Sequence, residues 1–273
     1  MFGTKLNYDS RLFLEGEEVS GINTVDFSYS NSVNTINPLG FSDGVTTING
    51  ETQQNFSFTR DLVYKSVVAS GVGGSSSFTG SNNLSGSIHY NGESYGFKSG
   101  YLNNWSINCA VGAPIKENCS FVVYDEMRSG ASASGSATAP SLSIPSQGSI
   151  TATCDNSTTN RVIGFDYAVT CNRKPYYSIG NKEPTEVKFI PPLNITAAVQ
   201  IEVDDAFLES GRNFLETGKS SRTVNLKVDG RNGGPTLVDA SVPNACLVSE
   251  SLSASSDGSL RLTLNYMGHI TTT

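Results

Sequence analysis

One short motif has the spacing of a catalytic nucleophile. The range Gly40–Gly44 reads GFSDG and matches the G-x-S-x-G pattern of serine hydrolases, with Ser42 as the nucleophile. That chemistry needs a buried strand before the serine and a helix after it, because the turn between them exposes the hydroxyl. Pro38 precedes the motif and the letters VTTING follow it. Neither flank suits such a turn, so we interpret the motif as an ordinary loop turn.

Histidines and acids add no second catalytic group. The chain has two histidines, His89 and His269, and neither has a His, Cys or carboxylate at dyad or ligand spacing. The run DGRNGG at 229–234 lacks the alternating acids and the closing glutamate of a calcium loop, so it predicts a hairpin turn. Asp204 and Asp205 are explained by helix capping. We therefore expect no enzyme activity, no catalytic residue, no cofactor and no metal.

The cysteines are expected to be reduced thiols. There are five of them, so they cannot all pair: Cys109, Cys119, Cys154, Cys171 and Cys246. The sequence contains no C-x-x-C, and the first residues have no apolar core of a secretory signal. Buried free thiols are the usual state in such a chain. Cys109 and Cys119 flank a turn and could face each other across a hairpin, but we expect them to be free.

Composition favours a chain of strands and turns. The 273 residues suit two domains of about 130 residues each. Only 37% of residues are hydrophobic and 16% charged, and Gly, Ser, Asn and Thr make up the difference, which is typical of strands joined by many turns. The net charge of −7 argues against a basic surface for gripping phosphates. No apolar run approaches the roughly 20 residues that span a bilayer, so no membrane partner is expected.

An internal repeat organises the sequence. The stretch 161–180 predicts a strand, a polar corner and a second short run closed by a glycine, and 21–40 is a weaker copy. A constant shift of 140 positions, without a gap, superimposes Ile22 on Val162, Asp26 on Asp166, Phe27 on Tyr167 and Gly40 on Gly180. A repeat of this length is a whole domain, so the chain is predicted to hold two copies of one β domain.

The predicted fold is mainly β, with two tandem antiparallel β-sandwich or partial-barrel modules. Each module should have about seven strands and at most one short helix. The expected boundaries are an N-terminal arm at 1–18, a first module at 19–127, a Gly/Ala/Ser-rich linker at 128–149 and a second module at 150–273. Within the arm, Leu12–Leu14 is expected to anchor on a neighbouring copy.

Several local predictions follow the same alternating pattern. Asn91-Gly92 predicts a hairpin, and the runs 104–111 and 119–124 predict another across Gly112–Pro114. We expect a helix at 204–216, capped by Asp204 or Asp205. Prolines on both sides predict a short strand confined to 186–190. In the strand that follows, Val199 and Ile201 are expected to take the places of Phe56 and Phe58. We expect three aromatic residues to pack in a core or interface rather than to form a sugar-binding face: Tyr95, Tyr101 and Trp105.

In these patterns the chain resembles the tail tube proteins of bacteriophages. The resemblance rests on the strand–corner–Leu/Ile–Gly pattern at 22–40 and 162–180, and on GYLNNWSINCAVGAPIKENCSFVVY at 100–124. It covers 19–127 and, through the repeat, 150–266. It implies β-sandwich modules that close into hexameric rings, which stack into a hollow tube for DNA passage. Two modules per chain would give a homotrimer with pseudo-six-fold symmetry; a homohexamer is the other arrangement left open.

The resemblance also implies partners and a location. The partners would be further copies of the chain, other tail proteins (tape measure, baseplate and any sheath) and DNA in transit. The location would be the tail of a virion made in the host cytoplasm. A charge of 3 × −7 = −21 for three chains would repel DNA phosphates from the tube wall. Two alternatives stay open: a tail-tip or baseplate hub ring of the same fold, and a carbohydrate- or receptor-binding β-sandwich.

Overall fold

The chain is built almost entirely of antiparallel strands. The computed structural model describes residues 10–36, 46–72, 83–90, 93–125, 127–129, 142–154, 157–158, 162–203, 222–254 and 259–270. Within these ranges all strand pairs are antiparallel, and helix is limited to α1 (Val67–Val72) and the single turn η1 (Gln147–Ser149). The prediction of a mainly β, antiparallel chain is confirmed.

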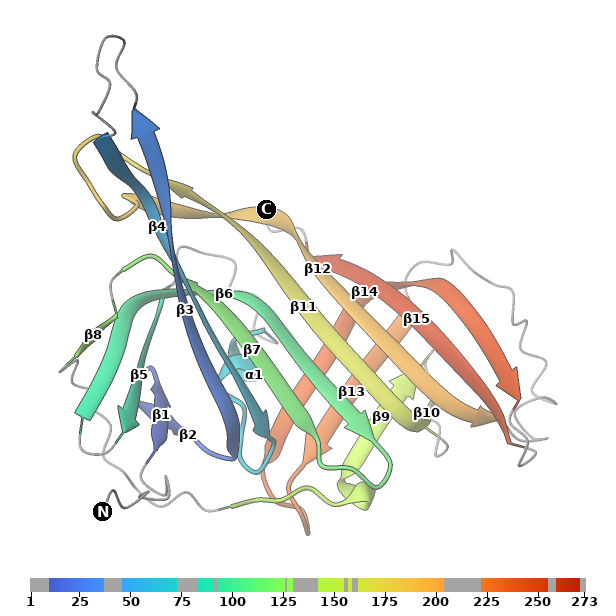
Figure 1. Cartoon of the computed structure of the whole chain (residues 1–273). Helices are drawn as coiled ribbons and strands as arrows, with labels where there is room; N and C mark the ends of the chain where they lie inside the picture. The colour runs from blue at the N-terminus through green and yellow to red at the C-terminus, as the bar shows by residue number, and fades with distance from the viewer. Residues whose placement is uncertain are drawn as a thin grey trace.

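Fifteen strands lie in the described residues (Figure 1). Those of the first half are β1 (Arg11–Leu14), β2 (Glu17–Val19), β3 (Ile22–Ile36), β4 (Thr46–Asp61), β5 (Leu84–Tyr90), β6 (Glu93–Ala110), β7 (Lys116–Val123) and β8 (Arg128–Ser129). Those of the second half are β9 (Ile150–Cys154), β10 (Ser157–Thr158), β11 (Val162–Tyr176), β12 (Glu186–Val203), β13 (Arg222–Asp229), β14 (Thr236–Ala254) and β15 (Leu260–Ile270).

The strands of the two halves pair in the same order. In the first half the order is β2-β1-β5-β6-β7-β4-β3, and in the second it is β10-β9-β13-β14-β15-β12-β11. The two orders match strand for strand along the chain, with β8 as an extra strand on β6. Each half thus has the seven strands that the alternating pattern predicts.

Two long strands, β6 and β14, each belong to two layers. The first part of β6 pairs with β5 and the second part with β7, while β14 passes from β13 to β15 in the same way. Both strands carry a register shift at the crossover, between Leu102 and Asn104 in β6 and between Leu247 and Ser249 in β14. A bulge bends a strand and raises its twist, which lets one strand serve both sheets. The sequence predicted two separate runs where β6 is continuous.

Register corrects one predicted correspondence. Phe56 pairs with Phe27 in the first half, and Ala197 pairs with Tyr167 in the second. Ala197 and Val199, rather than Val199 and Ile201, therefore occupy the positions of Phe56 and Phe58. The predicted match was wrong by two residues because a shift of two leaves every side chain on the same face. Alternation along a single strand cannot detect such a shift.

The segment expected to be an arm belongs to the chain's own core. Leu12, Phe13 and Leu14 are buried in β1, which pairs with both β2 and β5. The expectation that Leu12–Leu14 anchors on a neighbouring copy is therefore wrong. Three consecutive apolar residues in a strand need cover on both faces, and the fold supplies it within the chain. Residues 1–9 lie outside the described part.

Prolines do not confine the strand at 186–190, because β12 continues through Pro191 and Pro192 to Val203. These prolines fall in an irregularity between the pairs Asn172–Ile190 and Thr170–Asn194, where the ladder does not require their missing N–H groups.

Both predicted hairpins form: Tyr90 pairs with Glu93, and β6 turns into β7. Part of the expected linker is ordered as β8 and as a contact in which Ser143 N donates to Val63 O.

A buried ion pair lies in the core of the first half. The Arg60 guanidinium contacts the Glu117 carboxylate, and both side chains are almost inaccessible to solvent. Glu117 also accepts hydrogen bonds from the Trp105 ring nitrogen at 2.7 Å and from the Ser66 hydroxyl. Ser66 in turn caps α1 by accepting from Ala69 N at 2.9 Å. This network links β4, β6, β7 and α1.

The same two core positions are apolar in the second half. Arg60 and Glu117 are directly opposite each other, and so are Ile201 and Leu262. The sequence reasoning missed this ion pair. Arg60 is in step with the buried Phe58, so the alternation itself indicates that Arg60 points into the core. Both halves contribute to one continuous cluster of buried hydrophobic residues.

Candidate assembly interface

Residues considered for catalysis do not converge in the described structure. The ranges Gly40–Gly44 and 204–216 lie outside it. His89 packs edge-on against Phe13, with ring centroids 4.9 Å apart. His269, on β15, lies opposite Asn194 of β12. Among the described residues, no group of three His, Cys, Asp or Glu side chains is placed to hold a metal ion. No helix in those ranges is long and apolar enough to cross a membrane.

Aromatic residues considered for sugar binding do not share an exposed face. Trp105 is buried, and Tyr101 packs against Tyr124 with Arg173 5.4 Å from its ring centre. Only Tyr95 is exposed, where its hydroxyl donates to Glu93. The prediction that these rings pack in a core is thus confirmed for Trp105 and Tyr101.

All five cysteines lie in the described residues, and none of them forms a disulfide. Trp105, not Cys109, is the residue opposite Cys119, so the two cysteines flanking the turn do not face each other. Burial raises the pKa of the Cys171 thiol to about 11 and that of Cys119 well above its ordinary value. These thiols are therefore protonated at neutral pH, and they lack the lowered pKa of a reactive cysteine.

The two halves are joined where β6 pairs with β11. The pairs run from Asn104–Thr170 to Ala110–Gly164. On the core side, Trp105 lies opposite Val169 and Ile107 lies opposite Tyr167, and all four side chains are buried. The Trp105 and Tyr167 rings meet edge to face at 5.4 Å between centroids. This internal joint merges the two halves into one sheet.

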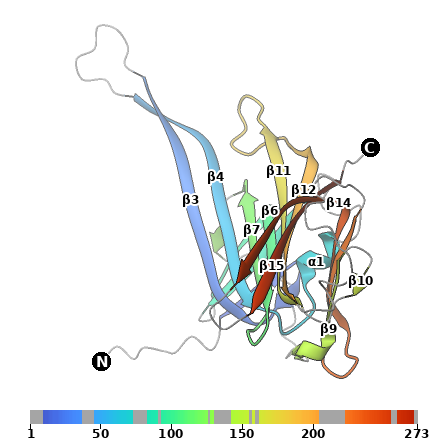
Figure 2. The ribbon, with the colours of Figure 1, turned by 90° about the vertical axis from the view of Figure 1, so that its right-hand side faces the viewer.

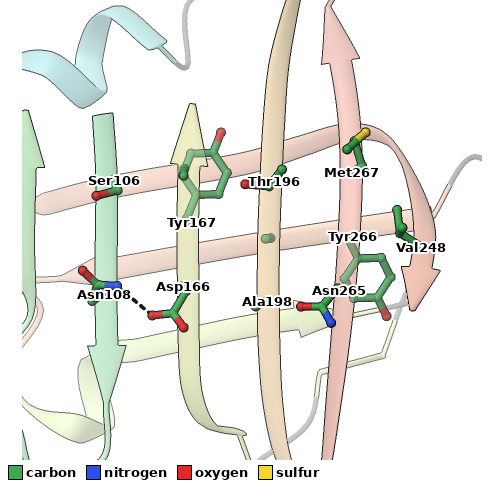
Figure 3. Close-up of a pocket in the computed structure, with 12 residues that line it drawn as sticks. Ser106, Asn108, Asp166, Tyr167, Thr196, Ala198, Val248, Asn265, Tyr266 and Met267 are labelled. Atoms are coloured by element: carbon green, nitrogen blue, oxygen red, sulfur yellow. Dashed lines mark hydrogen bonds between the residues drawn. The ribbon is translucent and has the colours of Figure 1, made fainter. Parts of the chain in front are cut away.

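On the opposite face of the sheet, the internal joint is polar. Asn108 Nδ2 donates to Asp166 Oδ1 at 2.8 Å across β6 and β11 (Figure 3). The ladder continues into the first half, where Asn118 Nδ2 donates to Asn108 Oδ1 at 3.2 Å and Thr59 Oγ1 donates to Asn118 Oδ1 at 3.0 Å. These side chains satisfy one another's hydrogen bonds, so few polar groups on this part of the face need another partner.

A hollow of about 310 Å³ lies on this polar face, across β6, β11, β12 and β15 (Figure 3). Ser106, Asn108, Asp166, Thr196 and Asn265 line it, together with alanines and the exposed Met267. Its one carboxylate, Asp166, accepts the hydrogen bond from Asn108, and the remaining polar lining consists of hydroxyl and amide groups. The hollow follows the curved polar surface of the sheet.

The sheet ends in two edges that correspond to the two strands of the internal joint. Its order is β3-β4-β7-β6-β11-β12-β15-β14. β3 is the counterpart of β11, and β14 is the counterpart of β6. Within the described residues, β3 pairs only with β4, and the 246–254 part of β14 pairs only with β15. Figure 2 also shows the hairpin of β3 and β4 projecting beyond the rest of the sheet.

The free edges expose what the internal joint buries. Tyr29 on β3 is 55% exposed, whereas Val169, its counterpart on β11, is 0% exposed. Leu252 on β14 is 54% exposed, whereas Ile107, its counterpart on β6, is 0% exposed. An unpaired edge strand with exposed apolar side chains favours pairing with another chain. The two edges together form the candidate assembly interface.

No protein-family model matches the chain, and no curated protein matches its sequence. The joint and the two edges must therefore be interpreted from their own geometry.

Proposed function

We propose that this chain is a structural protein whose copies join edge to edge into a ring, and that the rings stack into a hollow phage tail tube for DNA passage. One observation supports the self-assembly: the internal joint pairs a β11 edge with a β6 edge, and among the described residues one further edge of each kind has no strand beside it. A contact between two different surfaces repeats from copy to copy and closes a ring when the rotation permits. The tube and its cargo come from the family resemblance.

We further infer that the two halves are copies of one module. The matching strand order, the matching bulges in β6 and β14, and the constant shift of 140 between β3 and β11 support this inference. Three chains would then close a ring of six modules, with three internal joints and three joints between chains. Six chains would close a larger ring of twelve modules.

The polar face of the sheet is the surface that suits a channel wall. Among the described residues, its charged side chains are Asp26, Asp61, Asp166, Glu202, Lys116 and Arg261; Lys116 lies opposite Asp61, and Arg261 lies opposite Glu202. Their sum is 2 − 4 = −2 per chain, or −6 for three chains, a small share of the total −21. A weakly acidic wall of Asn, Ser and Thr would repel phosphates mildly, and each of its two cations lies opposite an acid on the next strand.

Two alternatives remain, and the observations weigh on them differently. A single ring at the tail tip or baseplate would use the same joints and the same edges. A carbohydrate-binding sandwich would need an exposed aromatic platform, and Trp105 and Tyr101 are buried. We therefore keep the hub ring as the second candidate. For either ring, the proposed partners are tape measure, baseplate and any sheath proteins, and the proposed location is the tail of the virion.

Electron microscopy of the purified protein in negative stain, with its mass in solution measured alongside, tests the proposal. We expect rings or tubes with a central hole, and a ring mass near 3 × 29.0 = 87 kDa. Single rings that never stack would favour the hub ring. A protein that stays monomeric at all concentrations and ionic strengths would overturn self-assembly, and a glycan screen would then be the next measurement.

A further inference from the structure

The internal joint also specifies how two copies meet. We infer that β3 of one copy pairs antiparallel with residues 249–254 of β14 in the next copy, in the register that β11 and β6 use within the chain. This inference rests on the proposed self-assembly and adds its geometry. It requires that each strand of the internal joint can be matched residue by residue to a free edge.

The match for β3 follows from its partner and its bulge. β3 and β11 both shift register just after their first residue, between Ile22 and Thr24 and between Val162 and Gly164. From there, Thr24 corresponds to Gly164 and each later residue follows by the same shift of 140. The counterpart of Asp166 is thus Asp26.

The match for β14 follows in the same way. Leu102 lies opposite Phe121 just before the bulge of β6, and Leu247 lies opposite Tyr266 just before the bulge of β14. The residues that follow therefore correspond by a shift of 145. The inferred pairs between copies are Val25–Ala254, Asp26–Ser253, Phe27–Leu252, Ser28–Ser251, Tyr29–Glu250 and Ser30–Ser249.

These pairs are chemically consistent on both faces of the sheet. On the core side, Phe27 meets Leu252, so the joint covers an exposed leucine with an aromatic ring. On the polar side, the Ser253 hydroxyl lies opposite Asp26, where it can donate to the carboxylate as Asn108 donates to Asp166. The other core-side pairs are Val25 with Ala254 and Tyr29 with Glu250. A slip of one residue would break both the Phe27–Leu252 match and the Asp26–Ser253 match, because it moves every side chain to the other face.

The joint between copies should be weaker than the internal one. Glu250 replaces Trp105, and Ala254 replaces Cys109, so less apolar surface is buried at each contact. Copies are therefore expected to fold alone and to associate reversibly. The direction of the contact is fixed, because the β3 edge and the β14 edge are different surfaces.

Two charge substitutions test the direction of the contact. Tyr29→Glu and Leu252→Glu each place a carboxylate in one edge, opposite Glu250 and opposite Phe27 of the neighbouring copy respectively, and both side chains are solvent-exposed in the single chain. Each variant alone should associate about a hundredfold more weakly and stay monomeric. Tyr90→Glu is the matched control, because Tyr90 is similarly exposed but lies on β5, away from both edges, so it should assemble normally.

Mixing the two edge variants gives the decisive result. Tyr29→Glu keeps an intact β14 edge and Leu252→Glu keeps an intact β3 edge, so a mixture should form a 1:1 dimer that grows no further. Analytical ultracentrifugation would detect this dimer. If either variant alone assembles as the unmodified protein does, or if the mixture contains only monomers, the head-to-tail pairing of β3 with β14 is wrong.

Cysteine cross-linking tests the register. Ser28→Cys and Ser251→Cys in one chain place thiols on directly opposite residues of neighbouring copies, whereas Ser28→Cys with Ser253→Cys represents a slip of two residues. Under mild oxidation the first protein should form a covalent ladder on a non-reducing gel, with about tenfold more product than the second, because a disulfide needs Cβ atoms within roughly 4.5 Å. The unmodified protein, with its five native thiols, measures the background.

Microscopy of the same samples separates failure of the register from failure of the proposed function. Rings whose cross-link forms only in the slipped pair would overturn the inferred register. Rings that cross-link at neither pair would overturn the pairing of these edges but leave a ring-forming protein. Absence of any assembly, in the cysteine variants and in the unmodified protein alike, would overturn both.

Discussion

Replacing Glu117 with leucine is expected to destabilise the protein by about 3–5 kcal/mol, because the Arg60 guanidinium would remain buried without its counter-charge. The substitution also removes the acceptor for the Trp105 ring nitrogen and the Ser66 hydroxyl. Urea unfolding followed by tryptophan fluorescence measures the loss, since the chain has a single tryptophan in direct contact with Glu117.

The second half of the chain supplies the control for this experiment. Ile201 and Leu262 occupy the positions of Arg60 and Glu117, so the double variant Arg60→Ile with Glu117→Leu copies an arrangement that this fold already contains. It should be more stable than the Glu117→Leu single variant, with a coupling energy of about 2 kcal/mol between the two sites. Strictly additive single effects would mean that the two charges do not stabilise each other in the core.

Replacing Ile107 with alanine is expected to cost about 2–5 kcal/mol, whereas Leu252→Ala should cost less than about 0.5 kcal/mol in the single chain. The two residues hold corresponding positions on β6 and β14. β11 lies beside β6 at Ile107, opposite β7. Leu252 on β14 pairs with β15 on one side and, within the described residues, has no strand on the other side. The difference between the two losses in unfolding free energy therefore measures how much a neighbouring strand stabilises this position.

Concentration distinguishes the two variants further. Measured below the association threshold, Leu252→Ala should unfold like the unmodified protein, and at high protein concentration it should assemble less readily. A loss of several kcal/mol for Leu252→Ala in the monomer would show that the 246–254 part of β14 is already covered within the chain. That result would contradict both the correspondence with Ile107 and the free edge.

Much of the fold can be predicted from local pattern. Alternation predicted strands at both hairpins, and it placed Trp105 and Tyr101 in packed surroundings rather than on a sugar-binding face. The shift of 140 places β3 over β11, and in the structure each of these strands has a register shift just after its first residue. Turn chemistry predicted the reversal at 229–234, where Gly230 N donates to Pro235 O. All of these signals are carried by neighbours in the chain.

Local pattern was wrong where the outcome depends on distant partners. Leu12–Leu14 has the composition of a surface anchor, yet it is core because β5, some 70 residues later, pairs with it. The prolines at 191 and 192 end a strand by propensity, but β11 carries the ladder past them through an irregularity. Arg60 and Glu117 have the composition of surface residues, and only their pairing across β4 and β7 makes burial tolerable.

The sequence by itself determined that this protein is a chain of antiparallel strands, with its polar and apolar residues on opposite faces. Tertiary structure alone decided which edges meet, because alternation sets the face of a side chain but not the strand that lies beside it. By pairing β6 with β11, the fold buries Ile107 and leaves its counterpart Leu252 exposed. Within the described residues the joint uses one edge of each half, and the other two edges form the candidate assembly interface.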